Sequence, residues 1–144
     1  MTVFANEEAF PNLKWLDISN NKFTELTGIK CPKLEYLDIG YNKLEKVSET
    51  WTGHSNLKVL KSVDNKFKSA QIFKDMQQLE ELYLEANVIQ TILGYETMPK
   101  LRKLHLRKNR IEKFEDELPP HESLKYLNLR GNKVPSLDQV ERLF

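Results

Sequence analysis

Residues 101–111 read LRKLHLRKNRI, and this stretch decides the fold of the chain. Counted from Leu101, an aliphatic residue stands at positions one, four, six and eleven, and Asn109 stands at position nine. Positions four and six lie two residues apart, which puts their side chains on one face of a short strand. One such strand cannot bury that face alone, so the stretch predicts neighbours of the same kind.

The same pattern recurs along the chain. The first leucines are spaced by 21, 23, 22, 22 and 23 residues, and they are Leu13, Leu34, Leu57, Leu79, Leu101 and Leu124. Position nine is asparagine in every copy: Asn21, Asn42, Asn65, Asn87, Asn109 and Asn132. We therefore predict one array over residues 1–144, with a partial repeat over 1–12 and repeats starting at 13, 34, 57, 79, 101 and 124, the last incomplete. Because both ends fall within a repeat, we expect a piece of a longer array.

The pattern L-x-x-L-x-L-x-x-N-x-L resembles the leucine-rich repeats, and its short repeat resembles the phosphatase-regulator type. This resemblance implies an α/β solenoid, a horseshoe with a parallel concave β-sheet. A repeat of about 22 residues leaves room on the convex side only for short helical, 3₁₀ or irregular segments. The asparagines are expected to form a structural ladder that satisfies turn backbone groups, without a catalytic role. Position six is apolar except at Ser62, whose hydroxyl should find a backbone partner, or the strand should distort.

Composition limits the class of protein. The 144 residues carry 22 Lys and Arg against 21 Asp and Glu, a net charge of +1. The sequence contains no run of about 18 apolar residues and no segment resembling a signal peptide, so we expect no membrane partner. The single cysteine, Cys31, excludes an internal disulfide, and none of the eleven asparagines lies in a glycosylation sequon. These features favour an intracellular location.

Positions three, five and seven of each repeat point away from the predicted core and form the concave face. The candidate partner-binding residues on it are Trp15, Asp17, Tyr36, Asp38, Glu81, Tyr83, Lys103, His105, Arg107, Tyr126 and Arg130. Trp, Tyr and Arg dominate protein interfaces, so Trp15, Tyr36 and Tyr83 are the expected anchors. The alternative is that strands simply favour aromatic residues. Charge on this face is acidic in the N-terminal half and basic in the C-terminal half, which suits orientation of a protein partner.

Catalysis, cofactors and metals have no support in the sequence. No phosphate-binding, dinucleotide-binding or zinc-protease motif occurs, and no Cys/His cluster suits a metal. His54 and His121 share one repeat position with Cys31, which indicates loop or core-edge roles. Residues 100–113 hold seven basic residues and one acid, a possible RNA-binding patch. Because acidic residues follow at once, a solvated face or an acidic protein partner is the better interpretation.

Three stretches resemble the leucine-rich-repeat radial-spoke proteins of motile cilia and flagella. They are residues 57–71 (LKVLKSVDNKFKSAQ), 104–107 (LHLR) and 126–132 (YLNLRGN). The resemblance implies a non-enzymatic scaffold in the axoneme, monomeric within a larger complex and bound to other radial-spoke subunits. The alternatives are a regulatory subunit that docks a protein phosphatase, an axonemal dynein-associated light chain, and an RNA-associated module.

Overall fold

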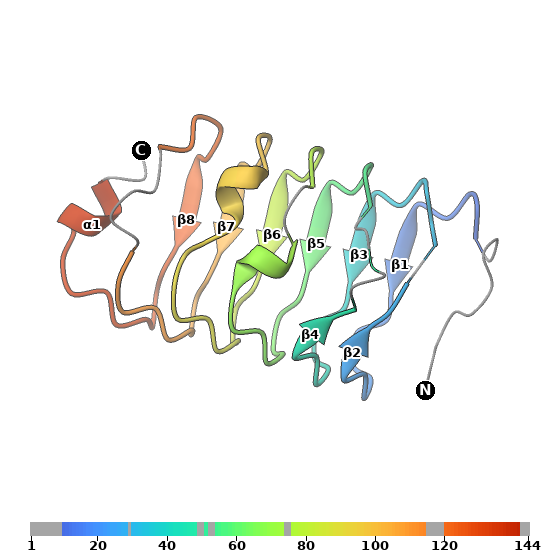
Figure 1. The fold of residues 1–144 in the computed structure, drawn as a ribbon, viewed down its shortest axis with the longest axis horizontal. Coiled ribbons are helices and arrows are strands. Elements are labelled where there is room, and N and C mark those ends of the chain that lie inside the picture. The colour runs from blue at the N-terminus through green and yellow to red at the C-terminus, as the bar shows by residue number, and fades with distance from the viewer. Residues whose placement is uncertain are drawn as a thin grey trace.

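The computed structural model describes residues 10–28, 30–48, 51, 54–73, 76–114 and 120–141. Six strands of three residues form one parallel sheet in the order β1-β3-β5-β6-β7-β8. The strands are β1 (Trp15–Asp17), β3 (Tyr36–Asp38), β5 (Val59–Lys61), β6 (Glu81–Tyr83), β7 (Lys103–His105) and β8 (Tyr126–Asn128). Each strand occupies positions three to five of its repeat, so each repeat forms one coil of a solenoid (Figure 1). The predicted leucine-rich repeat fold is confirmed.

The register of the sheet repeats without a slip. Trp15 of β1 pairs with Tyr36 of β3, and position three continues to pair with position three as far as Lys103 and Tyr126. The central residue of every strand is a leucine that points into the core, and its two neighbours point out. Equivalent positions therefore form straight columns across the sheet.

The outer half of the coils is less uniform. The first two coils carry two-residue strands, β2 (Glu25–Leu26) and β4 (Lys46–Val47), which pair in parallel. The next two carry the 3₁₀ helices η1 (Ala70–Phe73) and η2 (Tyr95–Thr97), and α1 (Asp138–Glu141) follows β8. Short 3₁₀ segments were predicted here, whereas the pairing of β2 with β4 was not.

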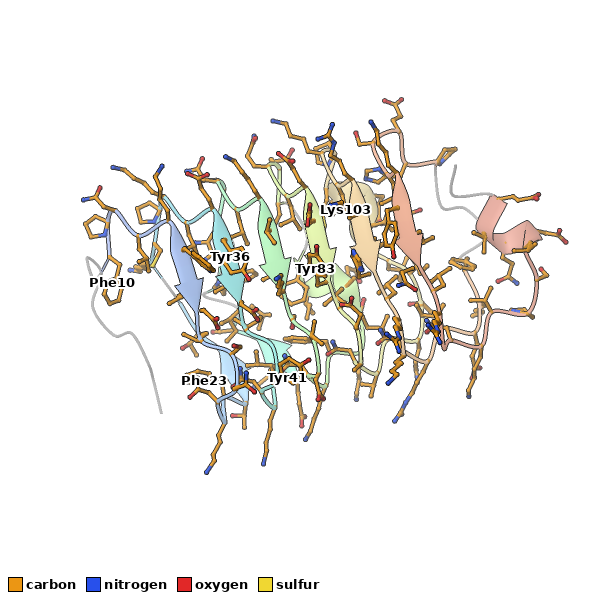
Figure 2. The ribbon with its side chains drawn as sticks, turned by 180° about the vertical axis from the view of Figure 1, so that it is seen from behind. Phe10, Phe23, Tyr36, Tyr41, Tyr83 and Lys103 are labelled. Atoms are coloured by element: carbon orange, nitrogen blue, oxygen red, sulfur yellow. The ribbon has the colours of Figure 1, made fainter. Side chains whose placement is uncertain are left out.

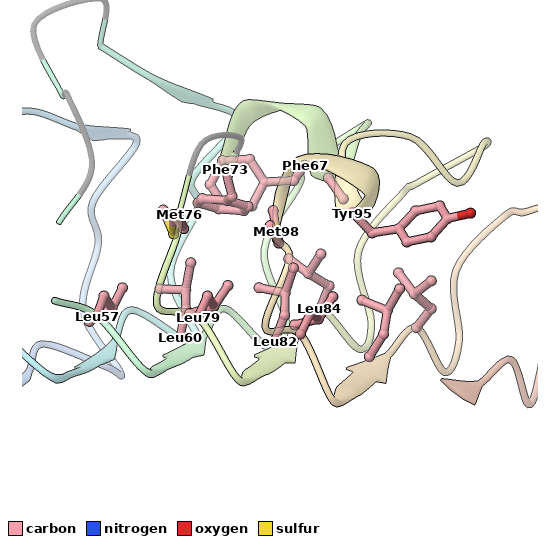
Figure 3. Packing of buried hydrophobic residues seen from close by; sticks show 14 of the residues in the cluster. Leu57, Leu60, Phe67, Phe73, Met76, Leu79, Leu82, Leu84, Tyr95 and Met98 are labelled. Atoms are coloured by element: carbon pink, nitrogen blue, oxygen red, sulfur yellow. The ribbon is translucent and has the colours of Figure 1, made fainter. Parts of the chain in front are cut away.

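The core lies between the sheet and the outer segments. Figure 3 shows leucines such as Leu60 and Leu82 above the strands, and a second layer around Phe67, Phe73 and Met98 beneath the 3₁₀ turns. Phe67 and Phe73 are fully buried with ring centroids 5.1 Å apart. Tyr95 is also buried, although the repeat pattern gave it no role.

Five of the six asparagines, from Asn42 to Asn132, join their coil to the one before it. Asn87 is typical: its Oδ1 accepts the Phe67 N–H at 3.0 Å, and its Nδ2 donates to the Ser62 carbonyl at 2.8 Å. It also donates to the carbonyls of Leu84 and Glu85 in its own coil. Among the described residues, Asn21 in the first coil bonds to its own coil, at the carbonyls of Ile18 and Ser19. The ladder thus satisfies backbone groups that the turn would leave unpaired.

The residue before each ladder asparagine has left-handed backbone geometry. These residues are Asn20, Tyr41, Asp64, Ala86, Lys108 and Gly131, with φ between 52° and 74°. Their identities vary, so the repeat pattern did not indicate this turn. Five of the six carry a side chain in a region that L-residues enter at a cost.

Ser62 is fully buried, and β5 beside it keeps its regular pairing on both sides. Its hydroxyl accepts from the side-chain amide of Asn65 at 3.4 Å. The expected backbone partner is therefore replaced by the ladder asparagine of the same coil. The predicted partial repeat over 1–12 has residues 1–9 outside the described part of the chain.

Candidate functional site: the concave face

The concave face is the surface formed by positions three, five and seven of the coils. Strand side chains alternate, so the central leucine of a strand leaves its two neighbours on this face. All eleven predicted partner-binding residues lie at these positions. Figure 2 shows Tyr36 and Tyr83 over this face, in a line across the strands.

Six side chains form a continuous row across the sheet, which we call the concave row. Its members in strand order are Trp15, Tyr36, Lys61, Tyr83, His105 and Tyr126. Trp15 meets Tyr36 edge-on with ring centroids 4.8 Å apart. Tyr83 stacks on His105 at 4.3 Å, and His105 meets Tyr126 at 4.8 Å. The row therefore joins all six strands.

Lys61 links the two halves of the row, although the sequence analysis did not select it. Its Nζ lies 5.4 Å from the ring centroids of both Tyr36 and Tyr83, a cation–π arrangement. A hydrogen bond with Tyr36 is the main cause that raises the Lys61 pKa, so the ammonium stays charged. The signal was available, because lysine at position five of β5 lies beside Tyr83 at position five of β6.

Glu81 and its partners hold the centre of the row. The Tyr83 hydroxyl donates to Glu81 Oε2 at 2.6 Å, and Lys103 Nζ donates to Oε1 at 2.8 Å. The bond from Lys103 is the main cause that lowers the Glu81 pKa. Burial, with a smaller contribution from Glu81, raises the Tyr83 pKa to about 12. Tyr83 is therefore a neutral hydrogen-bond donor at physiological pH.

His105 and Glu85 form a second pair toward the C-terminal end. His105 Nδ1 lies 3.2 Å from Glu85 Oε1. The other polar atoms of the two side chains, His105 Nε2 and Glu85 Oε2, are buried without a hydrogen-bond partner among the described residues. Buried polar atoms without partners are costly, so this pair is the least satisfied part of the row.

Position five has a different role near the two ends of the sheet. Asp17 accepts the Ser19 N–H and Asp38 accepts the Gly40 N–H, both at 2.9 Å. Asn128 accepts the Arg130 N–H at 3.1 Å in the last strand. These bonds close the turn after each strand. The hydrogen bonds with Ser19 are the main cause that lowers the Asp17 pKa, so this carboxylate is ionised while it shapes the turn.

The predicted charge separation is changed by pairing in the middle of the face. Glu81 is matched by Lys103, so this acid is locally compensated, and Glu85 lies 3.2 Å from the His105 ring. Arg107 and Arg130 have no ion pair within the described ranges. The two ends of the face therefore carry opposite charges, Asp17 and Asp38 at one and the two arginines at the other, while Lys61 keeps its charge beside Asp38.

The basic stretch over 100–113 does not form one patch. Lys100 bonds to Gln78, Arg102 pairs with Glu80, and Lys103 pairs with Glu81. Arg110 and Lys113 instead line a hollow of about 610 Å³ at the turns, with Glu112 paired to Lys133 beside them. The cations thus lie on several sides of the coil, which disfavours the RNA-associated alternative.

A column of alternating charge at position two was missed by the sequence analysis. Glu35 lies between Lys14 and Lys58, with Nζ to carboxylate distances of 3.1 and 2.8 Å, and Arg102 pairs with Glu80. The hydrogen bond from Lys58 is the main cause that lowers the Glu35 pKa. Alternation of sign from repeat to repeat was the signal that could have found it. These pairs lie at the border of the concave face.

The two histidines outside the row occupy the core edge. His54 is buried beside Trp51, with ring centroids 5.8 Å apart. His121 lies 3.0 Å from the Met98 carbonyl and accepts the Leu124 N–H at 3.2 Å. Cys31 is a buried free thiol packed in the core. Among the residues that the structure describes, no three His, Cys, Asp or Glu side chains gather where a metal could bind.

The repeats and the solenoid define the class of protein: the chain has the fold of the leucine-rich repeats, an array in which each coil packs on its neighbours. Residues 11–50 match the family model for leucine-rich repeats in two copies. A solved leucine-rich repeat protein of Leptospira interrogans superposes with a TM-score of 0.78 at 31% identity, over 90% of this chain and 34% of that one. No helix in the described part of the chain is long and apolar enough to cross a membrane.

Among curated proteins, the chain is similar to leucine-rich repeat-containing protein 23. The bovine protein is 31% identical over 137 residues, covering 92% of this chain and 39% of the relative. The human protein is 30% identical over 141 residues, covering 96% of this chain and 40% of the relative. The chain thus spans about 40% of the length of these relatives.

Proposed function

We propose that the chain is a non-enzymatic scaffold whose concave face binds a protein subunit within the radial spoke of a motile cilium or flagellum. Support for the setting comes from the radial-spoke resemblance of residues 57–71 and from the similarity to leucine-rich repeat-containing protein 23. A rigid array loses little conformational freedom on binding, which suits permanent assembly.

The concave row is the observation that carries the binding role. Its two ends are exposed aromatics: Trp15 is 65% exposed and Tyr126 is 45% exposed. Tryptophan and tyrosine are enriched among the residues that dominate binding free energy. Between these ends, Lys61, Tyr83 and His105 hold one another by ring and cation contacts. The row therefore offers two accessible anchors on a support that is already ordered.

The test is capture of radial-spoke subunits from a salt extract of flagellar axonemes by the immobilised chain. We expect the double variant Trp15→Ala/Tyr126→Ala to capture at least about 30-fold less of these subunits than the unchanged chain. The reason is that a strong anchor contributes about 2 kcal/mol or more to the binding free energy. The matched control is Tyr41→Ala, which removes an aromatic ring that is 53% exposed at a turn outside the concave face.

Equal recovery by the double variant and the unchanged chain would contradict the role of the concave face. Recovery of a phosphatase catalytic subunit in place of radial-spoke proteins would instead select the regulatory-subunit alternative. Circular dichroism of each variant confirms that the array is folded in every arm.

A further inference from the structure

The ends of the concave face differ in charge, and the middle does not contribute to the difference. In the middle, Glu81 lies 2.8 Å from Lys103 Nζ and Glu85 lies 3.2 Å from His105. Lys61 is held between two tyrosine rings. The middle of the face therefore carries charges of both signs, including the Lys61 ammonium between its two rings.

At the C-terminal end, two arginines occupy position seven of adjacent coils. Arg107 follows β7 and Arg130 follows β8, and the Lys108 N–H bonds to the Arg130 carbonyl at 2.8 Å, which fixes the two turns side by side. Arg130 and Lys108 are exposed, and neither they nor Arg107 form an ion pair with a described residue. Arginine pairs of this kind favour carboxylates, which they bind through two parallel hydrogen bonds.

At the N-terminal end, Asp17 and Asp38 hold negative charge at position five of β1 and β3. Each carboxylate uses one oxygen, Oδ1, to accept a turn N–H. The Asp17 carboxylate is exposed, and its pKa is lowered by the bonds with Ser19, so it remains ionised. Lys61 lies beside Asp38 in register and offsets part of this charge, but the two carboxylates outnumber it. This end therefore favours a cation on a partner, opposite to the preference of the arginines.

The hydrogen bonding and the width of the sheet favour one secondary structure in a partner. An extended peptide laid on the side-chain face of this sheet finds no strand backbone to pair with, because the strand backbones bond to one another. An α-helix satisfies its own backbone and offers side chains all along its length. Parallel strands lie about 4.8 Å apart, so the five steps from β1 to β8 span about 24 Å. At 1.5 Å per residue, a helix of about 16 residues covers that distance.

We propose that the concave face binds a single α-helix of about 16 residues across the strands, with acidic residues at the end over Arg107 and Arg130 and basic residues at the end over Asp17 and Asp38. Aromatic or aliphatic side chains of this helix contact Trp15 and Tyr126. This inference rests on the proposed function, since it specifies the partner of the same face.

The test uses a displayed library of 18-residue helical peptides that share an alanine and leucine framework. The end positions are randomised among Glu, Lys and Gln, and the immobilised chain selects binders at low salt. We expect Glu to exceed Lys about tenfold at one end and Lys to exceed Glu about tenfold at the other, as charge complementarity fixes orientation. Selection on Arg107→Glu/Arg130→Glu should reverse the preference at the acidic end only.

The matched control is Arg110→Glu/Lys125→Glu, which makes the same change in net charge at exposed sites outside the concave face. It should leave the selected sequences unchanged. The inference is wrong if no peptide is retained, if neither end shows a preference, or if the control shifts the selection as much as the arginine variant. Loss of axonemal capture in Trp15→Ala/Tyr126→Ala together with an absent end preference would retain the proposed function and reject this polarity.

Discussion

The inner and outer halves of the coils obey different rules. On the inner side, all six strands have three residues, the same register and a central leucine that faces the core. On the outer side, two-residue strands give way to 3₁₀ helices, and residues as different as Trp51, Phe73 and Tyr95 fill the core. On the inner side, backbone hydrogen bonds between all the strands fix the period of the repeat. On the outer side, the main requirement is that side chains fill the core. Packing tolerates many shapes if the volume is filled.

The largest effect is expected at Gly94, where two outer turns touch. A Cβ at this position would lie 2.5 Å from Gln71 Cα and 2.8 Å from its backbone nitrogen, and φ is +96°. We expect Gly94→Ala to lower the free energy of unfolding in urea by about 4 kcal/mol, from backbone strain and overpacking together.

The matched control is Gly131→Ala, on the inner turn. Its φ is +74°, but the nearest atoms, those of Lys108, lie at 3.5 Å, so only the left-handed backbone opposes a side chain. The expected loss is about 1 kcal/mol. Equal losses in the two variants would show that the outer half does not depend on the close approach of η1 and Gly94.

The asparagine ladder gives the next largest effect and tests the inner half. Asn87→Ala leaves the Phe67 N–H and the Ser62 carbonyl without the bonds that Asn87 provides, while Asn109 still serves the Leu84 carbonyl. Two buried groups without partners should cost about 3 kcal/mol in urea unfolding.

Asn21→Ala is the internal comparison for the ladder, because Asn21 is exposed and its bonds within the described part of the chain stay in its own coil. Its loss should remain below about 1 kcal/mol. Similar losses at Asn21 and Asn87 would mean that the asparagines stabilise single turns and do not join neighbouring coils.

Much of the inner half was predictable because its constraints recur at fixed spacing. The strand positions, their shared face and the place of the asparagines all follow from residues such as Leu104 and Asn109. The left-handed residue of each turn was missed because the turns share only a backbone conformation. The residues themselves, such as Tyr41, Ala86 and Gly131, have no side-chain property in common. On the outer side, short 3₁₀ segments were predicted as a class, but the pairing of β2 with β4 was missed because the outer contacts are made by different residues in each coil.

The candidate site was predictable only as a set of positions. The eleven residues lie on the concave face because strand alternation places them there, but their partners depend on rotamers and register. Lys61 was overlooked since lysine on a surface is ordinary until two rings flank it. The pairing of Glu81 with Lys103 likewise removed charge that a count along the sequence assigned to opposite halves. The binding role of these residues stays a prediction.

A smaller effect is expected at Ser62, the one position where the inner pattern is broken. Ser62→Ala should cost less than about 1 kcal/mol, because Asn65 keeps its bond to the Ile39 carbonyl at 3.0 Å. Ser62→Leu restores the pattern but adds volume to a fully buried site, and we expect a loss of about 1–2 kcal/mol. If Ser62→Leu instead stabilised the chain in thermal and urea unfolding, Ser62 would be a packing defect. The inner half would then accept an aliphatic residue at position six of every repeat.

The smallest effect concerns His54, at the outer edge of the core. Burial lowers its pKa, and a backbone hydrogen bond with Cys31 only partly opposes this shift. As the pH falls through the ordinary histidine range, the unfolded chain therefore binds a proton before the folded chain does, and the free energy of unfolding decreases. Above that range both states are neutral and the contribution vanishes. One proton limits the slope to about 1.4 kcal/mol per pH unit. Urea unfolding between pH 7.5 and about pH 5 should show this decrease in the unchanged chain and a weaker one in His54→Gln, because carboxylates contribute mainly at lower pH. An identical slope in both would mean that this outer site tolerates a charge, and that the outer half is more open to water than its buried side chains indicate.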